Sequence, residues 1–326
     1  MKGLVLSITA GQGHNQTAMV ISKRFNECGV ECKYLDVYKF INPILSDSVN
    51  KIYLMSTKAI PKIYGGVYRM CEKRGVQSGA GIHGLNRITN SVLSRSLIKL
   101  IQKEKPDFII CTHIFAALLV TYISSIEHLN AKTIGVITDF TIHPYWEDSL
   151  LDYYIIANER LTIQGIKKGF PENKFLPLGI PIGTKFSRKI EKSKAKEILN
   201  LHSKHTILVM SGSMGFGAVY KEIEELDKLD MDFEIVSVSG NNKKLKTKID
   251  SMETRKKIYS YGYINNVDVF MDACDCIITK PGGLTTSEAL AKQIPMLINN
   301  PIPGQEDRNV EFLLNAGAAM RISSTN

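Results

Sequence analysis

The chain has 326 residues, of which 44% are hydrophobic and 22% are charged, and this length and composition fit a soluble globular protein with two cores. They exclude a disordered or fibrous protein, and no apolar run reaches the roughly 20 residues that a membrane-spanning helix needs. The six cysteines are scattered, which favours reduced thiols and a cytoplasmic protein over a disulfide framework. The formal net charge is +9, and no nucleic-acid partner is expected.

The first strand, expected at Gly3–Ile8, is followed by the glycine-containing loop GQGH. Gly11 and Gly13 allow a tight turn, after which a helix is expected to begin near His14. The positive end of the helix dipole favours the neutral imidazole, so His14 is a candidate general base. The alternative is a histidine that only packs at the start of the helix.

A basic stretch follows between Lys51 and Lys105. Eleven Lys and Arg residues stand there against two Glu residues, so this stretch has a net excess of +9, equal to that of the whole chain. Aromatic and aliphatic residues are interspersed, and Tyr64, Tyr68 and Arg69 lie at its centre. This mixture suits a surface that binds anionic membrane lipids, and the alternative is an ordinary solvated helix.

Short apolar runs alternate with helix-length segments along the whole chain, which is typical of parallel sheets covered by helices on both faces. The expected fold class is therefore α/β, with two tandem Rossmann-like doubly wound domains whose ligand-binding edges can face each other across a cleft. A stretch with Pro and Gly residues after Phe175 marks the boundary, so the domains are expected at 1–180 and 181–326. The predicted strands are Gly3–Ile8, Glu31–Val37, Phe108–Cys111, Thr133–Ile137, Tyr153–Ala157, Thr206–Met210, Phe233–Ser237, Lys257–Tyr261, Cys276–Thr279, Pro295–Ile298 and Ala319–Ile322.

The first strand of the second half ends in a loop of small residues, SGSMGFG, which contains Gly212, Ser213 and Met214. Small residues leave backbone N–H groups free to converge on an anion, and a diphosphate is the natural ligand. The spacing fits neither the dinucleotide-binding motif nor the P-loop, which speaks against an oxidoreductase and an NTPase. A flexible glycine turn is the alternative.

The segment KPGGLTTSEAL, from Lys280 to Leu290, is the strongest signal. Gly283 belongs to a Gly-Gly pair that opens a helix, and the first turn presents N–H groups with the hydroxyls of Thr285 and Thr286. Glu288 lies about one turn in, where its carboxylate can accept hydrogen bonds from a ribose diol. A capping-box interaction of Glu288 with the helix start explains the residue equally well.

The next loop, PIPGQEDRN, places Gln305 and Glu306 at a helix entrance. An amide beside a carboxylate can recognise sugar hydroxyls, and a capping acid is the alternative.

An Asp-x-Asp pair, Asp230 and Asp232, superficially fits a cation site for a diphosphate, but it precedes a strand on the edge opposite the ligand loops. A solvated turn is expected there, and we predict that no metal or other cofactor is required.

Together these motifs resemble the diacylglycerol sugar transferases of glycosyltransferase family 28, which include bacterial processive diacylglycerol glucosyltransferases and plant monogalactosyldiacylglycerol synthases. The resemblance covers nearly the whole chain. Its elements are GQGH, TDFTIHPYW at Thr138–Trp146, GSMG, the run GYINNVDVFMDACDCIITKPGGLTTSEAL, and PIPGQEDRN. The last two are specific, whereas the glycine loops alone are not.

The resemblance implies a GT-B architecture, in which the C-terminal domain binds a UDP-sugar and the N-terminal domain takes a lipid acceptor. It implies inverting transfer of a hexose from UDP-glucose or UDP-galactose to diacylglycerol in glycolipid synthesis. By motif position, Gly212, Ser213, Met214, Thr285 and Thr286 contact the diphosphate, Glu288 the ribose, Gln305 and Glu306 the sugar, and Tyr263 and Ile264 the uracil.

In the N-terminal domain the resemblance implies that His14 is the base and that Asp139 assists or orients it. Gly13, His143 and Trp146 are expected near the acceptor, with the basic stretch on the membrane. The protein is therefore expected to attach peripherally to the cytoplasmic membrane. Family members continue past the position of Asn326 with a final helix, so the C-terminal domain can be incomplete here.

Three other functions stay open. A lipid-linked N-acetylglucosaminyltransferase of the peptidoglycan type would keep the donor site, although its N-terminal loop usually has a longer glycine run. A UDP-sugar epimerase would need no acceptor. A catalytically inactive UDP-sugar-binding protein would bind UDP without transfer.

Overall fold

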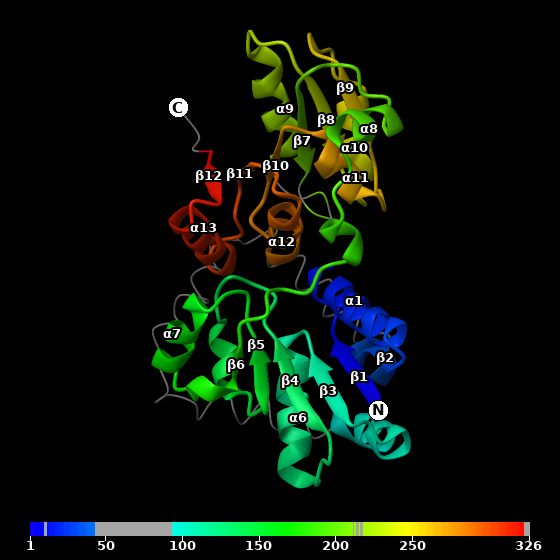
Figure 1. Ribbon diagram of the computed structural model, residues 1–326, viewed down its shortest axis with the longest axis vertical. Coiled ribbons are helices and arrows are strands. Elements are labelled where there is room, and N and C mark those ends of the chain that lie inside the picture. Colours follow the sequence, from blue (N-terminus) through cyan, green and yellow to red (C-terminus); the bar gives the residue numbers. More distant parts are fainter. Residues whose placement is uncertain (10–11, 43–92, 211, 213–214, 216–217, 323–326) are drawn as a thin grey trace. The chain divides into compact units, whose positions relative to one another are not determined.

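A computed structural model describes residues 1–9, 12–42, 93–210, 212, 215 and 218–322. The chain divides into two compact units (Figure 1). Unit 1 comprises Met1–Pro181 with Ile302–Gln305, and unit 2 comprises Ile182–Pro301 with Glu306–Asn326. Each unit is described by itself below.

Unit 1 contains a parallel sheet with the strand order β2-β1-β3-β4-β5-β6. All five strands that were predicted in this half are present. The sequence did not indicate β6, because a strand of two residues is too short to stand out as an apolar run. The strands are β1 Lys2–Ser7, β2 Glu31–Asp36, β3 Phe108–Cys111, β4 Lys132–Val136, β5 Tyr153–Ile155 and β6 Phe175–Leu176, and the helices include α1 Gly13–Glu27, α2 Val37–Ile41, α6 Ile114–Ile126, α7 Arg160–Lys167 and the 3-10 turn η2 Pro144–Asp148.

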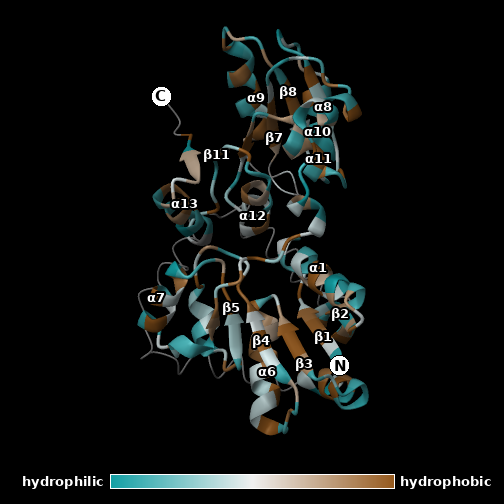
Figure 2. Ribbon diagram, viewed as in Figure 1, coloured by the Kyte–Doolittle hydropathy of each residue, from teal (hydrophilic) through white to brown (hydrophobic). Residues whose placement is uncertain are grey.

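The core of unit 1 forms because its central strands are apolar on both faces. Figure 2 shows β1 and β3 as strongly hydrophobic, and every residue from Phe108 to Cys111 is buried. On one face Val5 and Phe108 pack against Ala18 and Ile21 of α1. Burial on both faces is what parallel strands with crossover helices require.

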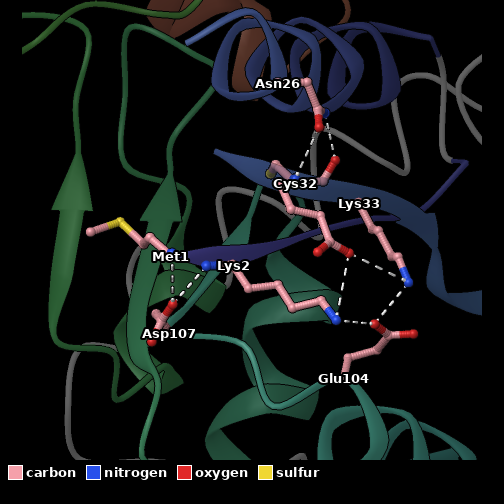
Figure 3. Close-up of polar contacts among 8 residues, drawn as sticks. Met1, Lys2, Asn26, Cys32, Lys33, Glu104 and Asp107 are labelled. Carbon is pink, nitrogen blue, oxygen red and sulfur yellow. Dashed lines mark hydrogen bonds and ion pairs between the residues drawn. The ribbon is translucent and has the colours of Figure 1, made fainter. Parts of the chain in front are cut away.

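Helix 93–104 is fixed to the sheet by ion pairs at the start of the strands. The Nζ atoms of Lys2 and Lys33 lie 2.9 and 2.8 Å from the carboxylate of Glu104, while Asp107 accepts a 2.6 Å hydrogen bond from the Lys2 backbone N–H (Figure 3). The bonds from Lys33 and Lys2 lower the pKa of Glu104 to about 2. The acidic residue near the end of the basic stretch is therefore paired with lysines that lie outside that stretch.

Unit 2 contains a second parallel sheet, with the order β12-β11-β10-β7-β8-β9. All six strands predicted for this half are present, within one residue at each end. They are β7 Thr206–Met210, β8 Glu234–Val238, β9 Ile258–Tyr261, β10 Cys276–Thr279, β11 Met296–Ile298 and β12 Ala319–Arg321, and the helices are α8 Lys192–Ile198, α9 Val219–Lys228, α10 Lys243–Asp250, α11 Val267–Ala273, α12 Gly283–Lys292 and α13 Gln305–Asn315. The two sheets confirm the α/β fold class.

A buried ion pair fixes α12 against α11. The Nζ atom of Lys292 lies 2.6 Å from the carboxylate of Asp272, and the two side chains are 1% and 0% exposed. The same carboxylate oxygen accepts a 3.1 Å hydrogen bond from the Ile190 N–H, and Lys292 also donates to the carbonyl of Arg188. These contacts attach the C-terminal end of α12 to α11 and so help to fix the direction of the helix axis.

Within the described residues, no helix is both long and apolar enough to cross a membrane. The described cysteines are all free thiols.

Candidate active site

In each unit the motifs of interest follow the carboxyl ends of adjacent strands. In unit 1, α1 follows β1, His113 follows β3, and Thr138 follows β4, and these three strands are neighbours in the sheet. Residues far apart in the chain therefore meet at one edge of the sheet.

His14 is the second residue of α1, and its ring is held through one nitrogen. Its Nδ1 atom lies 2.9 Å from the carbonyl oxygen of Thr112 and 2.9 Å from the hydroxyl oxygen of Thr138. A carbonyl oxygen can only accept, so Nδ1 carries the proton and Nε2 is left with a free lone pair. Thr112 also donates its hydroxyl hydrogen to the carbonyl of His14 at 3.0 Å. These contacts select the tautomer that a general base needs.

Burial lowers the pKa of His14, although the bond to the Thr112 carbonyl opposes that shift. The imidazole is therefore neutral at pH 7. The sequence attributed the neutral form to the helix dipole, whereas the structure identifies desolvation as the principal cause. The role of His14 as base stays a prediction.

A second histidine, His113, was not identified from the sequence. Its ring packs edge-on against that of His14, with centroids 4.6 Å apart, and its Nδ1 accepts the Phe115 N–H at the start of α6. Burial, followed by the proximity of His14 and His143, holds its pKa well below the usual range. The signal that could have found it is its position directly after the buried strand at Phe108–Cys111.

The TDFTIHPYW motif contributes residues of three kinds. Thr138 contacts His14. Asp139, the next residue in the chain, is partly buried, and its predicted role in assisting the base stays a prediction. His143 caps η2, because its Nδ1 accepts the Tyr145 N–H at 3.2 Å. Trp146 is only 5% exposed and packs over Gly135, where an added Cβ would lie 2.8 Å from the indole. Trp146 therefore packs in the core of unit 1, and its contact with an acceptor stays a prediction.

Four other residues were predicted to lie on the acceptor or membrane side. Gly13 is the first residue of α1. Tyr64, Tyr68 and Arg69 lie outside the described residues, as does most of the basic stretch.

In unit 2, the glycine loop after β7 depends on its glycines. Gly212 and Gly215 have φ angles of +63° and +58°, which side-chain-bearing residues rarely adopt. A Cβ on Gly215 would also lie 2.1 Å from the carbonyl oxygen of Ser239. Asn242 donates to the Gly215 carbonyl at 3.0 Å and caps α10. Ser213 and Met214 lie outside the described residues.

The KPGG segment connects β10 to α12, as predicted, and Gly282 and Gly283 form the helix entrance. Thr285 is partly exposed there, but Thr286 is fully buried. The hydroxyl of Thr286 donates to the carbonyls of Gly282 and Gly283, and its N–H donates to Gly282 as well. A phosphate contact by Thr286 would require that hydroxyl to leave the helix start, and the contact stays a prediction.

Glu288 is half-buried on α12, and no described residue donates a hydrogen bond to its carboxylate. Burial raises its pKa to about 7; nearby Lys185 opposes this shift and Asp268 adds to it. Lys185 and Asp268 form an ion pair of 3.1 Å at the start of α11. The capping-box alternative is not what the structure has, because α12 begins at Gly283 and Glu288 is its sixth residue, whereas a capping-box glutamate is the third. A desolvated carboxyl that receives no hydrogen bond from the described residues can accept hydrogen bonds from a ligand.

The loop between β9 and α11 carries the two residues predicted for the uracil. Tyr263 is 52% exposed and Ile264 is partly buried. An exposed aromatic ring can stack on a base.

The last loop brings an ion pair that the sequence did not predict. Lys280 donates to the carboxylate of Glu306, the second residue of α13, and Gln305 begins that helix. Asn309, one turn later, donates to the carbonyl of Pro281 at 2.9 Å. Helix α13 is thus tied to the KPGG segment by both contacts. The sequence assigns no role to Lys280 of the KPGG segment, because sequence spacing does not indicate its partner.

The described residues contain no cluster of three or more His, Cys, Asp or Glu side chains that could hold a metal ion. Asp230 and Asp232 are exposed between α9 and β8, at the strand ends opposite the ligand loops, as the sequence indicated. The prediction that no metal or other cofactor is required stays a prediction.

Two family models match the chain. The model described as monogalactosyldiacylglycerol synthase matches residues 14–182, and the glycosyltransferase family 28 C-terminal domain matches residues 206–326. Among curated proteins, a processive diacylglycerol beta-glucosyltransferase from Bacillus pumilus (strain SAFR-032) is 30% identical over 334 residues, covering 99% of this chain and 83% of its own. A protein of the same name from Bacillus cereus (strain AH187) is 28% identical, over 98% and 82%.

Solved structures of low sequence identity share the fold. The crystal structure of Acinetobacter baumannii MurG has a TM-score of 0.62 at 16% identity and covers 98% of this chain and 85% of its own. The UDP-GlcNAc 2-epimerase from Neisseria meningitidis, solved with UDP-GlcNAc, has a TM-score of 0.54 at 14% identity, with coverages of 98% and 87%. These likenesses confirm the GT-B fold class and, at such identities, only the fold.

Proposed function

Because the chain belongs to the monogalactosyldiacylglycerol synthase family and carries a glycosyltransferase family 28 C-terminal domain, we propose that this glycosyltransferase moves a hexose from a UDP-sugar to diacylglycerol. The names of its Bacillus relatives support diacylglycerol as the acceptor and a β-linked sugar in the product. The donor is UDP-glucose or UDP-galactose, and the reaction belongs to glycolipid synthesis.

The donor half of the proposal rests on unit 2. A glycine loop, the N-terminus of α12 and the Glu288 carboxyl, to which no described residue donates, follow β7 and β10, which are neighbouring strands. Phosphate oxygens would accept hydrogen bonds from the N–H groups, and the ribose hydroxyls would donate to Glu288. Tyr263 and Ile264 would flank the uracil, with Gln305 and Glu306 at the sugar.

The catalytic step is a direct displacement. Nε2 of His14 takes the proton of the acceptor hydroxyl, the hydroxyl oxygen bonds to the anomeric carbon, and the bond from that carbon to the phosphate oxygen breaks. One displacement inverts the anomeric configuration, so a UDP-α-sugar gives a β-glycoside. The departing UDP is stabilised by loop and helix N–H groups without a metal ion. The observation that carries the base assignment is the pair of contacts at Nδ1 of His14.

The test compares two histidine variants. Wild-type protein, His14→Ala and the control His128→Ala, at an exposed position, are incubated with diacylglycerol vesicles and UDP-glucose or UDP-galactose, and the lipids are measured by mass spectrometry. We expect His14→Ala to reduce turnover by about 10²- to 10⁴-fold with unchanged UDP affinity, and His128→Ala to change neither. Equal losses of turnover and UDP affinity in His14→Ala would remove the base assignment.

The membrane-facing half of the proposal concerns the basic stretch between Lys51 and Lys105. We propose that it binds anionic lipids at the cytoplasmic face, so that the protein reaches diacylglycerol while attached peripherally. Hydrogen exchange should slow in this stretch when anionic vesicles are added, and high salt should reverse the effect. Binding that does not respond to salt would argue against this surface.

The same incubations separate the other candidate functions. Conversion of a UDP-sugar without any acceptor would indicate an epimerase. Tight UDP binding without any lipid product would indicate an inactive UDP-sugar-binding protein.

A further inference from the structure

The ion pair between Lys280 and Glu306 lies beside the glycine loop after β7 and the N-terminus of α12, which are the candidate diphosphate-binding groups of unit 2. Lys280 directly follows β10, and its ammonium group donates to the Glu306 carboxylate. A Cβ on Gly212, in the loop after β7, would lie 3.5 Å from Cε of Lys280. A Cβ on Gly282, which caps α12, would lie 3.5 Å from its Nζ. The lysine side chain therefore runs between the glycine loop and the start of α12.

The surroundings of this pair are rich in hydrogen-bond donors. The first N–H groups of a helix have no acceptor within the helix, and Gly282 supplies no side-chain cap to α12. Helix α12 has ten residues, so its N-terminus also carries a positive partial charge. The ammonium group donates to the carboxylate of Glu306. A ligand with several anionic oxygens would be a stronger partner for this lysine than one carboxylate.

A comparison within unit 2 shows that this pair is less deeply buried than the other ion pair beside α12. The side chains of Lys292 and Asp272 are 1% and 0% exposed, so that pair is sealed inside the fold. The side chains of Lys280 and Glu306 are 22% and 9% exposed. The first pair lies at the C-terminal end of α12, whereas the second joins the segment before its N-terminal end to α13.

We propose that Lys280 binds the diphosphate of the nucleotide and that Glu306 is its partner only while the site is empty. When the diphosphate arrives, the ammonium group exchanges the carboxylate for phosphate oxygens. The released carboxylate of Glu306 can then accept hydrogen bonds from hydroxyls of the transferred sugar. Lys280 supplies the positive charge that an enzyme using no metal ion needs at the leaving group. This inference rests on the proposed function, since it takes a nucleoside diphosphate as the ligand.

The exchange makes predictions of opposite sign for the two partners. Lys280→Met should weaken UDP binding about tenfold or more, because it removes a charge-assisted bond, and it should leave uridine binding unchanged. Glu306→Gln should tighten UDP binding severalfold, because the competing carboxylate charge is gone. If the ion pair only stabilised the position of α13, both variants would weaken the binding of uridine and of UDP to the same extent.

The experiment is calorimetric titration of wild-type and variant protein with uridine, UMP and UDP in a buffer without divalent cations. The matched control is Lys228→Met, which breaks an exposed lysine–glutamate pair of 2.7 Å with Glu225 at the far end of α9. We expect that control to change no affinity. An unchanged preference for UDP over uridine in Lys280→Met, or UDP binding by Glu306→Gln that is no tighter than wild type, would overturn the exchange and leave the proposed function intact. Wild-type protein that bound UDP no better than uridine would overturn both.

Discussion

The replacement Glu288→Gln should make the protein more stable and a poorer nucleotide binder at the same time. The carboxyl of Glu288 is desolvated on α12, and its pKa is raised to about 7 from an ordinary value of 4.5. Above pH 7 the folded protein must hold an ionised carboxylate to which no described residue donates a hydrogen bond. Glutamine has nearly the same shape and no charge.

The magnitude follows from the pKa shift. A rise from 4.5 to about 7 corresponds to a cost of about 3 kcal/mol for the ionised form, which partial exposure of the side chain reduces to about 1–2 kcal/mol. A raised carboxyl pKa means that the folded state binds more protons than the unfolded state. The stability cost therefore appears as the pH rises through 4.5 and is complete above 7. Glu288→Gln should raise the free energy of unfolding by about 1–2 kcal/mol at pH 8 and by much less at pH 5.

Ligand binding should have the opposite dependence. Ribose hydroxyls donate to the ionised carboxylate, so the affinity for uridine, which has no phosphate to titrate, should fall below pH 7. A loss of about 100-fold between pH 8 and pH 5 is expected if only the ionised form binds. In Glu288→Gln the affinity should be low and independent of pH over this range.

Denaturant unfolding at pH 5 and pH 8 measures the stability, and NMR titration with uridine measures the affinity. The control is Glu225→Gln, an exposed carboxylate on α9, which should change neither quantity appreciably. The reasoning is refuted if Glu288→Gln lowers the stability at pH 8, or if wild-type affinity for uridine is the same at both pH values.

Three further predictions follow from the contacts. Lys292→Met should lower the free energy of unfolding by about 3–5 kcal/mol in denaturant titrations, because it leaves the buried Asp272 charge unpaired, and replacing Asp272 with Leu as well should recover most of the loss. Gly215→Ala should weaken UDP binding in calorimetry with little change in the circular dichroism spectrum, because the loop cannot keep its positive φ and close backbone contact; unchanged affinity would show that the loop is not used. Thr138→Val should lower kcat by about tenfold without changing UDP affinity, because His14 loses one of the two oxygens that fix its tautomer, and Thr138→Ser should restore the rate.

The strands could be predicted because each buried strand of a parallel sheet is a continuous apolar run. Phe108–Cys111 and Cys276–Thr279 were located from hydrophobicity alone, and the loops after them are where ligand sites occur in such folds. The two-residue strand at Phe175–Leu176 was missed, because two residues leave no such pattern. Trp146 was placed near the acceptor from its motif, whereas its burial became visible only from its packing over Gly135.

The sequence by itself determined the fold class and which loops form the candidate site, since hydrophobic runs and glycine spacing are local properties of the chain. Contacts between residues far apart in the chain required the tertiary structure. The oxygens of Thr112 and Thr138 meet Nδ1 of His14 across 98 and 124 positions, and Lys280 meets Glu306 across 26. The parallel sheets bring the ends of adjacent strands together regardless of the sequence between them. The tautomer of the candidate base and the partner of the candidate phosphate lysine are therefore properties of the fold.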